Sequence, residues 1–180
     1  MKIRIPEAIF SRFHAHLFQG DLEQGAFLFG NVVDALFTVD DIYMVPSEGW
    51  DVQLDVYLEM KDAERGKIMQ IASKTRASVI DCHSHPGAGD DVWFSPSDIS
   101  GITSFAAYAK WKLRGAVYVA TVWGESSVDA VSWSNDYNRP ERVESVDIVG
   151  AAARRLVPRG SWFREPRAYR RKDGPSHDRE

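Results

Sequence analysis

A short apolar run in the middle of the chain is the feature that most constrains its fold. Residues Ala77–Cys82 form this run and predict a buried strand. A polar loop rich in glycine and aspartate, Pro86–Asp91, follows the run. A helix then begins at Ser95 or Ser97, and its apolar residues recur every three or four positions. Because Gly115–Trp123 predicts another strand, the chain mixes strands with helices, and its expected fold class is α/β (α+β).

Further elements are predicted on both sides of this unit. They are a helix at Pro6–Leu17, two or three strands within Gly25–Val45 broken at Gly30–Asn31 and Asp40–Asp41, a helix at about Leu58–Lys74, a half-exposed strand at Val128–Trp133 and a last strand at Val143–Val149. Beyond Ala153 the apolar pattern ends, which predicts a domain at residues 1–153 and an irregular tail at residues 154–180. Within that tail, residues 156–161 read LVPRGS, which coincides with the recognition sequence of thrombin.

Composition excludes several classes of protein. The 180 residues are 44% hydrophobic and 27% charged, which is ordinary for a globular protein and excludes a disordered or collagen-like chain. The single cysteine, Cys82, allows neither an internal disulfide nor a cysteine-rich zinc site. No apolar run approaches the roughly 18 residues of a membrane span, and the N-terminus lacks the apolar core of a signal peptide. We therefore expect a cytoplasmic protein with no membrane partner.

The charge of the chain is unevenly distributed. The formal net charge is −4, but residues 154–180 carry nine basic and four acidic residues, a balance of +5. The other 153 residues consequently have a balance of −9. A nucleic-acid-binding domain usually presents a basic folded face, so this acidic body with a basic tail predicts no nucleic-acid partner.

The segment Asp81–Asp98, which reads DCHSHPGAGDDVWFSPSD, contains the residues best suited to chemistry. His83 and His85 are two positions apart, so at the end of a strand both imidazoles leave on the same side. Asp98 would add an oxygen ligand. Two histidines and one carboxylate leave the fourth tetrahedral position of zinc for water, as catalytic zinc sites require. These three residues therefore predict metal-assisted hydrolysis.

Each part of this pattern also has a purely structural interpretation. Two histidines separated by one residue are more often ordinary surface or core residues than metal ligands. Ser95 can cap the following helix, with Pro96 as its first residue and Asp98 as the acidic partner of a capping box. The two roles are compatible, because Asp98 can lie in the first helical turn and still bind a metal.

The combination of motifs resembles the JAMM (MPN-plus) metallopeptidases. That family pattern is H-x-H-P, a short spacer and then S-x-x-D, matched here by HSHP, which starts at His83, and by SPSD, which ends at Asp98. The family also has an upstream glutamate in the prokaryotic form E-x-G-G-x-L-x-G, which Glu23–Gly30 is similar to, with Ala26 in place of the second glycine. The spacer of eight residues is somewhat longer than in many eukaryotic members. The resemblance covers about residues 1–149.

The resemblance implies a role for each matched residue. His83, His85 and Asp98 would hold one Zn²⁺ per chain, with a bound catalytic water. Glu23 would be the general base, which takes a proton from that water and passes it to the leaving amine. Ser95 would hydrogen-bond the developing oxyanion. The implied fold is the MPN (JAB) type, a curved mixed β-sheet flanked by helices, with a layout like that of cytidine deaminases.

The resemblance also implies a substrate class. The chain would be an isopeptidase or peptidase that cleaves after the C-terminus of a ubiquitin-like protein, releasing it from conjugates or maturing its precursor. The family includes members that act on sulfur-carrier proteins and members in bacterial defence operons, and the sequence does not choose between them. A non-catalytic MPN scaffold is the main alternative, although such members usually lack the ligands. A zinc deaminase is excluded because it needs a P-C-x-x-C pair.

Five other residues carry weaker predictions. Trp50 and Trp93 lie in loops near the expected site and are candidates for substrate contact. His14 and His16 are two positions apart on a predicted helix, so they face different sides and do not form a joint metal site. Cys82 points to the opposite strand face from the adjacent histidine and is expected to be a small buried hydrophobic residue.

Overall fold

The computed structural model describes residues 1–134 and 139–163. Within them, strands β11-β10-β1-β3-β2-β6-β7-β8-β9 form one curled mixed sheet in this order, and β4 and β5 form a separate hairpin. The strands are β1 (Lys2–Pro6), β2 (Gly25–Val33), β3 (Leu36–Met44), β4 (Trp50–Gln53), β5 (Leu58–Met60), β6 (Ser78–Ser84), β7 (Tyr118–Trp123), β8 (Val128–Trp133), β9 (Glu141–Arg142), β10 (Ser145–Val149) and β11 (Arg154–Leu156). The helices are α1 (Glu7–Leu17), α2 (Asp62–Thr75) and α3 (Pro96–Lys112), with 3-10 turns η1 (Ser47–Gly49) and η2 (Ser161–Phe163). The predicted α/β class is confirmed.

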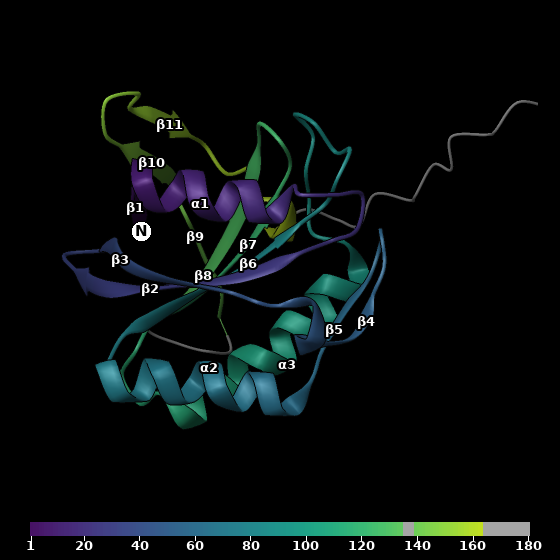
Figure 1. Cartoon of the computed structure of the whole chain (residues 1–180). Helices are drawn as coiled ribbons and strands as arrows, with labels where there is room; N and C mark the ends of the chain where they lie inside the picture. The colour runs from purple at the N-terminus through teal and green to yellow at the C-terminus, as the bar shows by residue number, and fades with distance from the viewer. Residues whose placement is uncertain (135–138, 164–180) are drawn as a thin grey trace, which may run out of the picture.

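Helices cover both faces of the sheet. Helix α1 lies on one face, and α2 and α3 lie together on the other (Figure 1). Phe13 and Leu17 of α1 belong to the apolar core of the first face, whereas Ile68 of α2 and Ala106 of α3 belong to the core of the second. Strand β8, predicted to be half-exposed, is buried at every position because both of its faces are covered. In the described part of the chain, no helix is long and apolar enough to cross a membrane.

The β2–β3 hairpin turns at a different place from the predicted breaks. The strands run through both predicted break points, and the chain reverses at Asp34 and Ala35, which have φ values of 49° and 59°. Two successive residues with positive φ match the twist of a two-residue hairpin turn. Gly30 serves close packing instead of a turn, because a Cβ there would lie 2.0 Å from the carbonyl oxygen of Thr38. The register shift between Phe29 and Gly30 is a bulge at that contact.

The first strand, β1, is missing from the predicted elements. It pairs in parallel with both β10 and β3, so that Lys2 lies opposite Ser145 and Leu36. Pro6 is the last residue of β1, and α1 therefore begins at Glu7. The alternation of charged and apolar residues over residues 2–5 is a local strand signal, but only the fold shows which strands it pairs with.

The second predicted helix begins later than expected. Residues Leu58–Met60 form strand β5, and α2 starts at Asp62. These three residues pair with β4. The apolar spacing of Leu58 and Met60 is compatible with a strand as well as with a helix, which explains why the pattern predicts them as part of the helix. The third helix agrees with its prediction, since Ser95 caps α3 and Pro96 is its first residue.

The prediction of an irregular tail after Ala153 is wrong for the residues that the structure describes. Residues Arg154–Leu156 form β11, which pairs antiparallel with β10. The turn η2 follows, and Trp162 within it packs against the core on the side of α2 and α3. The remainder of the predicted tail, residues 164–180, lies outside the described residues.

Candidate metal centre

Three predicted ligands meet where β6 ends and α3 begins. One nitrogen of His83, one nitrogen of His85 and one carboxylate oxygen of Asp98 all lie within 4.8 Å of one another. The Nε2 atom of His83 is 3.5 Å from Oδ1 of Asp98, and the Nε2 atom of His85 is 3.3 Å from Oδ2 of the same carboxylate. In residues 1–134 and 139–163 this is the one group of His, Cys, Asp and Glu side chains with the spacing for a metal ion.

Strand β6 directs its side chains to alternate faces of the sheet. His83 lies opposite Gly25 of β2 and Val122 of β7, so the strand is paired on both sides at the ligand. The backbone of His85 remains attached to the sheet, since its N–H donates to the carbonyl oxygen of Trp123 over 2.9 Å. Both imidazoles are therefore carried by paired backbone. The preceding residue, Cys82, is buried in the core on the α1 side, as predicted.

A capping box orients the third ligand. The N–H of Asp98 donates to Oγ of Ser95 over 3.2 Å, and the N–H of Ser95 donates to Oδ2 of Asp98 over 2.7 Å. The structure therefore confirms the capping interpretation of these two residues. It also brings the same carboxylate to both histidines, so the two interpretations hold together.

The histidines and the carboxylate of the cluster perturb one another. Burial acts to raise the pKa of Asp98, but the adjacent His83 and His85 outweigh it and hold that pKa well below its usual range. Burial acts to lower the pKa of His83, but the Asp98 carboxylate outweighs it and raises that pKa. These directions describe the cluster without a metal ion, and they show one negative and two potentially positive groups sharing a confined space.

The donor set fits a metal ion by two observations. The Nε2 atom of His83 is buried, and its contact with Oδ1 of Asp98 at 3.5 Å is too long for a good hydrogen bond, a state in which buried polar atoms are rarely left. A tetrahedral zinc ion with ligand bonds near 2.0 Å separates its ligand atoms by about 3.3 Å. The measured separations of 3.5 and 3.3 Å are close to this value. A bound cation would give the His83 nitrogen its partner.

Glu23 lies beside this cluster, where a general base would be needed. Its side chain is 4% exposed, and its Oε1 atom is 3.5 Å from Nε2 of His85. Burial raises the pKa of Glu23 to about 7; His83 opposes this shift, and two neighbouring carboxylates add to it. The backbone of Glu23 is fixed from the β4 side, since its N–H donates to Leu54 and its carbonyl oxygen accepts from the Gln53 side chain. Glu23 can therefore hold or release a proton near neutral pH.

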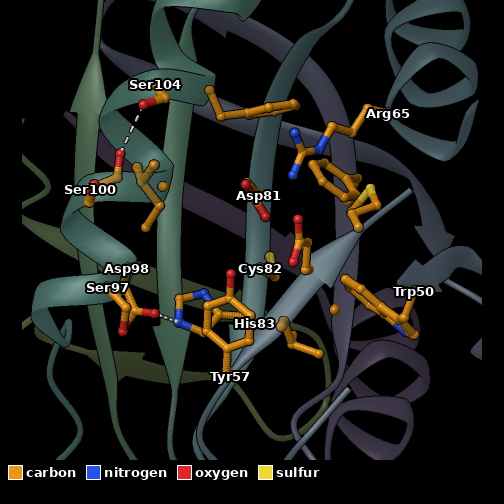
Figure 2. A pocket seen from close by; sticks show the side chains of 18 of the residues that line it. Trp50, Tyr57, Arg65, Asp81, Cys82, His83, Ser97, Asp98, Ser100 and Ser104 are labelled. Atoms are coloured by element: carbon orange, nitrogen blue, oxygen red, sulfur yellow. Dashed lines mark hydrogen bonds and ion pairs between the residues drawn. The ribbon is translucent and has the colours of Figure 1, made fainter. Parts of the chain in front are cut away.

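A cavity of about 720 Å³ opens beside the cluster. Its walls come from the β4–β5 hairpin, α2, α3 and β6, and Trp50, Arg65 and Asp81 lie around it (Figure 2). Trp50, a predicted contact residue, lines this cavity, whereas Trp93 is half-buried and is not among the described residues that line it. Each of the other predicted residues contacts a polar group of the protein. His14 faces the carbonyl oxygen of Glu125, His16 faces that of Gly25, and the Ser95 hydroxyl meets that of Ser97.

Asp81 is a cavity residue that the sequence analysis does not single out. It precedes His83 by two positions on β6, so its carboxylate emerges on the same face, where Tyr118 donates a hydrogen bond to it over 2.9 Å. Burial raises the pKa of Asp81, while His83 and the Tyr118 hydroxyl act to lower it. The sequence contains a signal that could have identified it: Asp81 is an acidic residue inside an otherwise apolar strand, and it lies two positions before the predicted ligand His83.

Comparisons with known proteins inform the fold alone. No family model matches the sequence, and no curated protein matches it. The solution structure of protein DSY2949 from Desulfitobacterium hafniense has a similar fold, with a TM-score of 0.53 and 14% sequence identity. The match covers 82% of this chain and 92% of that one. At this identity the likeness supports the mixed α/β architecture and carries no function.

Proposed function

We propose that this chain is a zinc-dependent metallopeptidase of the JAMM (MPN-plus) type with the corresponding MPN (JAB) fold. The observation that carries the proposal is the cluster of His83, His85 and Asp98, whose ligand atoms lie within 4.8 Å of one another and in which the buried Nε2 of His83 has only a long contact of 3.5 Å with the Asp98 carboxylate. In this proposal His83, His85 and Asp98 hold one zinc ion. The ion, when bound, supplies a Lewis acid that polarises a carbonyl and lowers the pKa of a water molecule.

Two residues near the proposed ion would carry out the proton transfer and the stabilisation of charge. Glu23 accepts the proton of the attacking water and later donates it to the leaving amine, a task suited to a carboxyl whose pKa is about 7. Ser95 stabilises the developing negative charge on the carbonyl oxygen. Because its hydroxyl also caps α3, Ser95 holds Asp98 at the same time.

We propose that the substrate is the C-terminus of a ubiquitin-like protein, joined to another protein by a peptide or isopeptide bond. The cavity lined by His83 and Asp98 supports this class, since the β4–β5 hairpin and α3 both border it. An extended chain end could add to the edge of that hairpin and present its last carbonyl to the site. Trp50, which lines the cavity, is the proposed contact residue, and a cytoplasmic location suits such a substrate. Processing of a sulfur-carrier protein of ubiquitin fold is the alternative of the same class.

The Glu23→Gln variant tests this function. Glutamine keeps the size of the side chain but cannot accept the proton, so we expect zinc content and Tm near wild type. Cleavage of a ubiquitin-like precursor, followed by gel electrophoresis and mass spectrometry, should fall about 10²- to 10⁴-fold. The matched control is Glu48→Gln, an exposed glutamate in η1, which should retain full activity.

Two outcomes would contradict the proposal. A Glu23→Gln variant that keeps zinc and wild-type cleavage would exclude Glu23 as the base. A wild-type protein that binds zinc but cleaves neither ubiquitin-like precursors nor isopeptide conjugates would favour the non-catalytic scaffold.

A further inference from the structure

The residues that follow β11 are anchored to a buried carboxylate. Asp129 of β8 is fully buried, and its two oxygens accept the N–H groups of Gly160 and Ser161 over 2.6 and 2.7 Å. A buried charge is stable only when such donors surround it, so the segment and the carboxylate depend on each other. Gly160 has a φ of +68°, a backbone conformation that favours glycine. We call Arg159–Phe163 the strap.

The strap contacts the loop that joins two of the metal ligands, Pro86–Ser95, which we call the ligand loop. The N–H of Phe94 donates to Oγ of Ser161 over 3.1 Å. Arg159 pairs with the carboxylate of Asp91 over 2.7 Å and also donates to the carbonyl oxygen of Asp90. The strap therefore holds the second half of the ligand loop by both backbone and side-chain groups.

Aromatic rings continue this connection towards the metal centre. The Trp162 ring meets Phe94 edge to face, with centroids 5.4 Å apart, and meets Trp133 of β8 in the same way at 5.3 Å. The Phe94 ring lies 6.2 Å from that of His83. Phe94 also directly precedes Ser95, whose backbone and hydroxyl orient Asp98. Phe94 thus connects the strap to both candidate ligands. Its ring links Trp162 to His83, and its backbone leads through Ser95 to Asp98.

The first half of the ligand loop is held from a different element. Glu125, which follows β7, accepts the N–H groups of Gly87 and Gly89 over 2.7 and 2.8 Å. The loop is consequently fixed at both ends, by Glu125 near His85 and by the strap near Asp98. The strap adds to the capping box and to the N–H of Val92, which donates to Oγ of Ser127 over 3.4 Å, in holding the segment that leads to the carboxylate.

We propose that the strap is a positioning element of the metal centre. It orders the ligand loop so that Asp98 is already placed against His83 before a metal ion binds, and the loop then loses less conformational entropy when the ion binds. By thermodynamic linkage, metal binding and strap docking stabilise each other. This inference rests on the metal-binding part of the proposed function and does not require peptidase activity.

Metal titration of strap variants is the first test. Ser161→Ala removes the acceptor of the Phe94 N–H, and Trp162→Ala removes the ring that packs on Phe94. Each variant should bind Zn²⁺ about 10- to 100-fold more weakly in competition with a chelator. The visible absorption of Co²⁺ bound in place of zinc should also change, because it reports ligand geometry. Ser134→Ala is the matched control, since Ser134 is half-buried and bonds to Glu141 away from the centre.

Proteolysis is the second test, because LVPRGS places a thrombin site between Arg159 and Gly160. Cleavage requires the strap to open, so its rate follows the open population. Saturating Zn²⁺ or Co²⁺ should slow cleavage relative to chelator-treated protein. A free peptide of the same six residues should be cut equally with and without metal. The His83→Ala/His85→Ala chain should likewise show no metal effect.

The outcomes separate this inference from the proposed function. Wild-type metal affinity and an unchanged Co²⁺ spectrum in both strap variants would overturn the strap's role and leave the metal centre intact. Cleavage at one rate with and without metal would do the same. A wild-type chain that binds neither ion would overturn the metal centre, and the strap's role with it.

Discussion

The two faces of the central sheet differ in what they bury. We call the α1 side the sealed face and the side of α2 and α3 the open face. The sealed face is filled by apolar side chains, including Ile80 and Cys82 of β6. The open face is hollowed by the cavity of about 720 Å³, into which β6 directs Asp81 and His83. Strand β6 therefore contributes apolar core residues to the sealed face and polar side chains to the cavity of the open face.

The alternation of side chains along β6 places core residues on one face of the sheet and polar, titratable residues on the other. Adjacent residues point to opposite faces, so Cys82 and His83 have unlike surroundings although they are covalently linked. Burial raises the pKa of the Cys82 thiol to about 12, which keeps it neutral and unreactive. His83 instead faces the Asp98 carboxylate, with its Nε2 atom 3.5 Å from Oδ1. The predictions below test whether stability depends mainly on the sealed face and metal binding on the open one.

The largest effect is expected for the histidines of the open face. The His83→Ala/His85→Ala variant should fall from about one zinc per chain to none, because one carboxylate alone is a weak ligand set. Zinc measured by atomic emission after gel filtration checks this. Cys82→Ala is the control, since its thiol lies on the sealed face and should leave zinc content unchanged. Full zinc in the double variant would show that the ion binds elsewhere.

Phenylalanine truncation should distinguish the two faces in stability. Phe13 is fully buried on the sealed face, so Phe13→Ala should cost about 3–5 kcal/mol of unfolding free energy and leave zinc affinity unchanged. Phe105 lines the cavity of the open face, so Phe105→Ala should cost less, because solvent already reaches that site. Urea denaturation of both variants makes the comparison. Equal costs would mean that the open face is packed as tightly as the sealed one.

A smaller effect is expected from pH in the metal-free protein. The folded pKa of Glu23 is about 7, above its ordinary value of 4.5, so the fold favours the protonated acid. That contribution is fully present below pH 4.5 and is lost as pH rises to about 7. The raised pKa of His83 acts in the same sense, so the comparison needs Glu23→Gln. Denaturation in chelator across this range should show a flatter pH dependence for that variant than for wild type.

The smallest effect is expected for a partly exposed ion pair at the sheet edge. Asp147 of β10 pairs with Arg155 of β11 over 2.6 Å, and this pairing lowers the pKa of Asp147. A lowered pKa contributes stability above the ordinary value of 3.8, and the contribution is lost as pH falls through the folded value. Asp147→Asn should lower Tm by no more than a few degrees at neutral pH, since exposed pairs contribute little. A large loss would mean that β11 holds the strap in place.

Local signals were sufficient for the metal ligands. The spacing of His83 and His85 predicts that they share one side of a strand end, and the capping pattern places Asp98 in the first turn of a helix. Both signals depend on residues close in the sequence, and the structure brings these three side chains together. The placement of Glu23 beside them agrees with the family resemblance, which is the only basis on which the sequence predicts it.

Contacts between segments far apart in the sequence could not be predicted from local patterns. Strand β1 is paired with residues more than 140 positions away, and the strap is held by Asp129, an acid inside an apolar strand. The strap has no hydrophobic period of its own, so its composition resembles that of an irregular tail. Its order comes from donors and acceptors on other elements, which become neighbours only after the chain folds.

The sequence alone thus determined which side chains can bind a metal, because periodicity and capping are encoded by neighbouring residues. The tertiary structure decided what surrounds them: the cavity with Asp81, the buried position of the His83 nitrogen beside Asp98 and the strap against the ligand loop. The physical reason is that burial, pKa and pairing depend on groups distant in the chain. Their positions are set by how the two faces of the sheet are covered, and no local pattern carries that information.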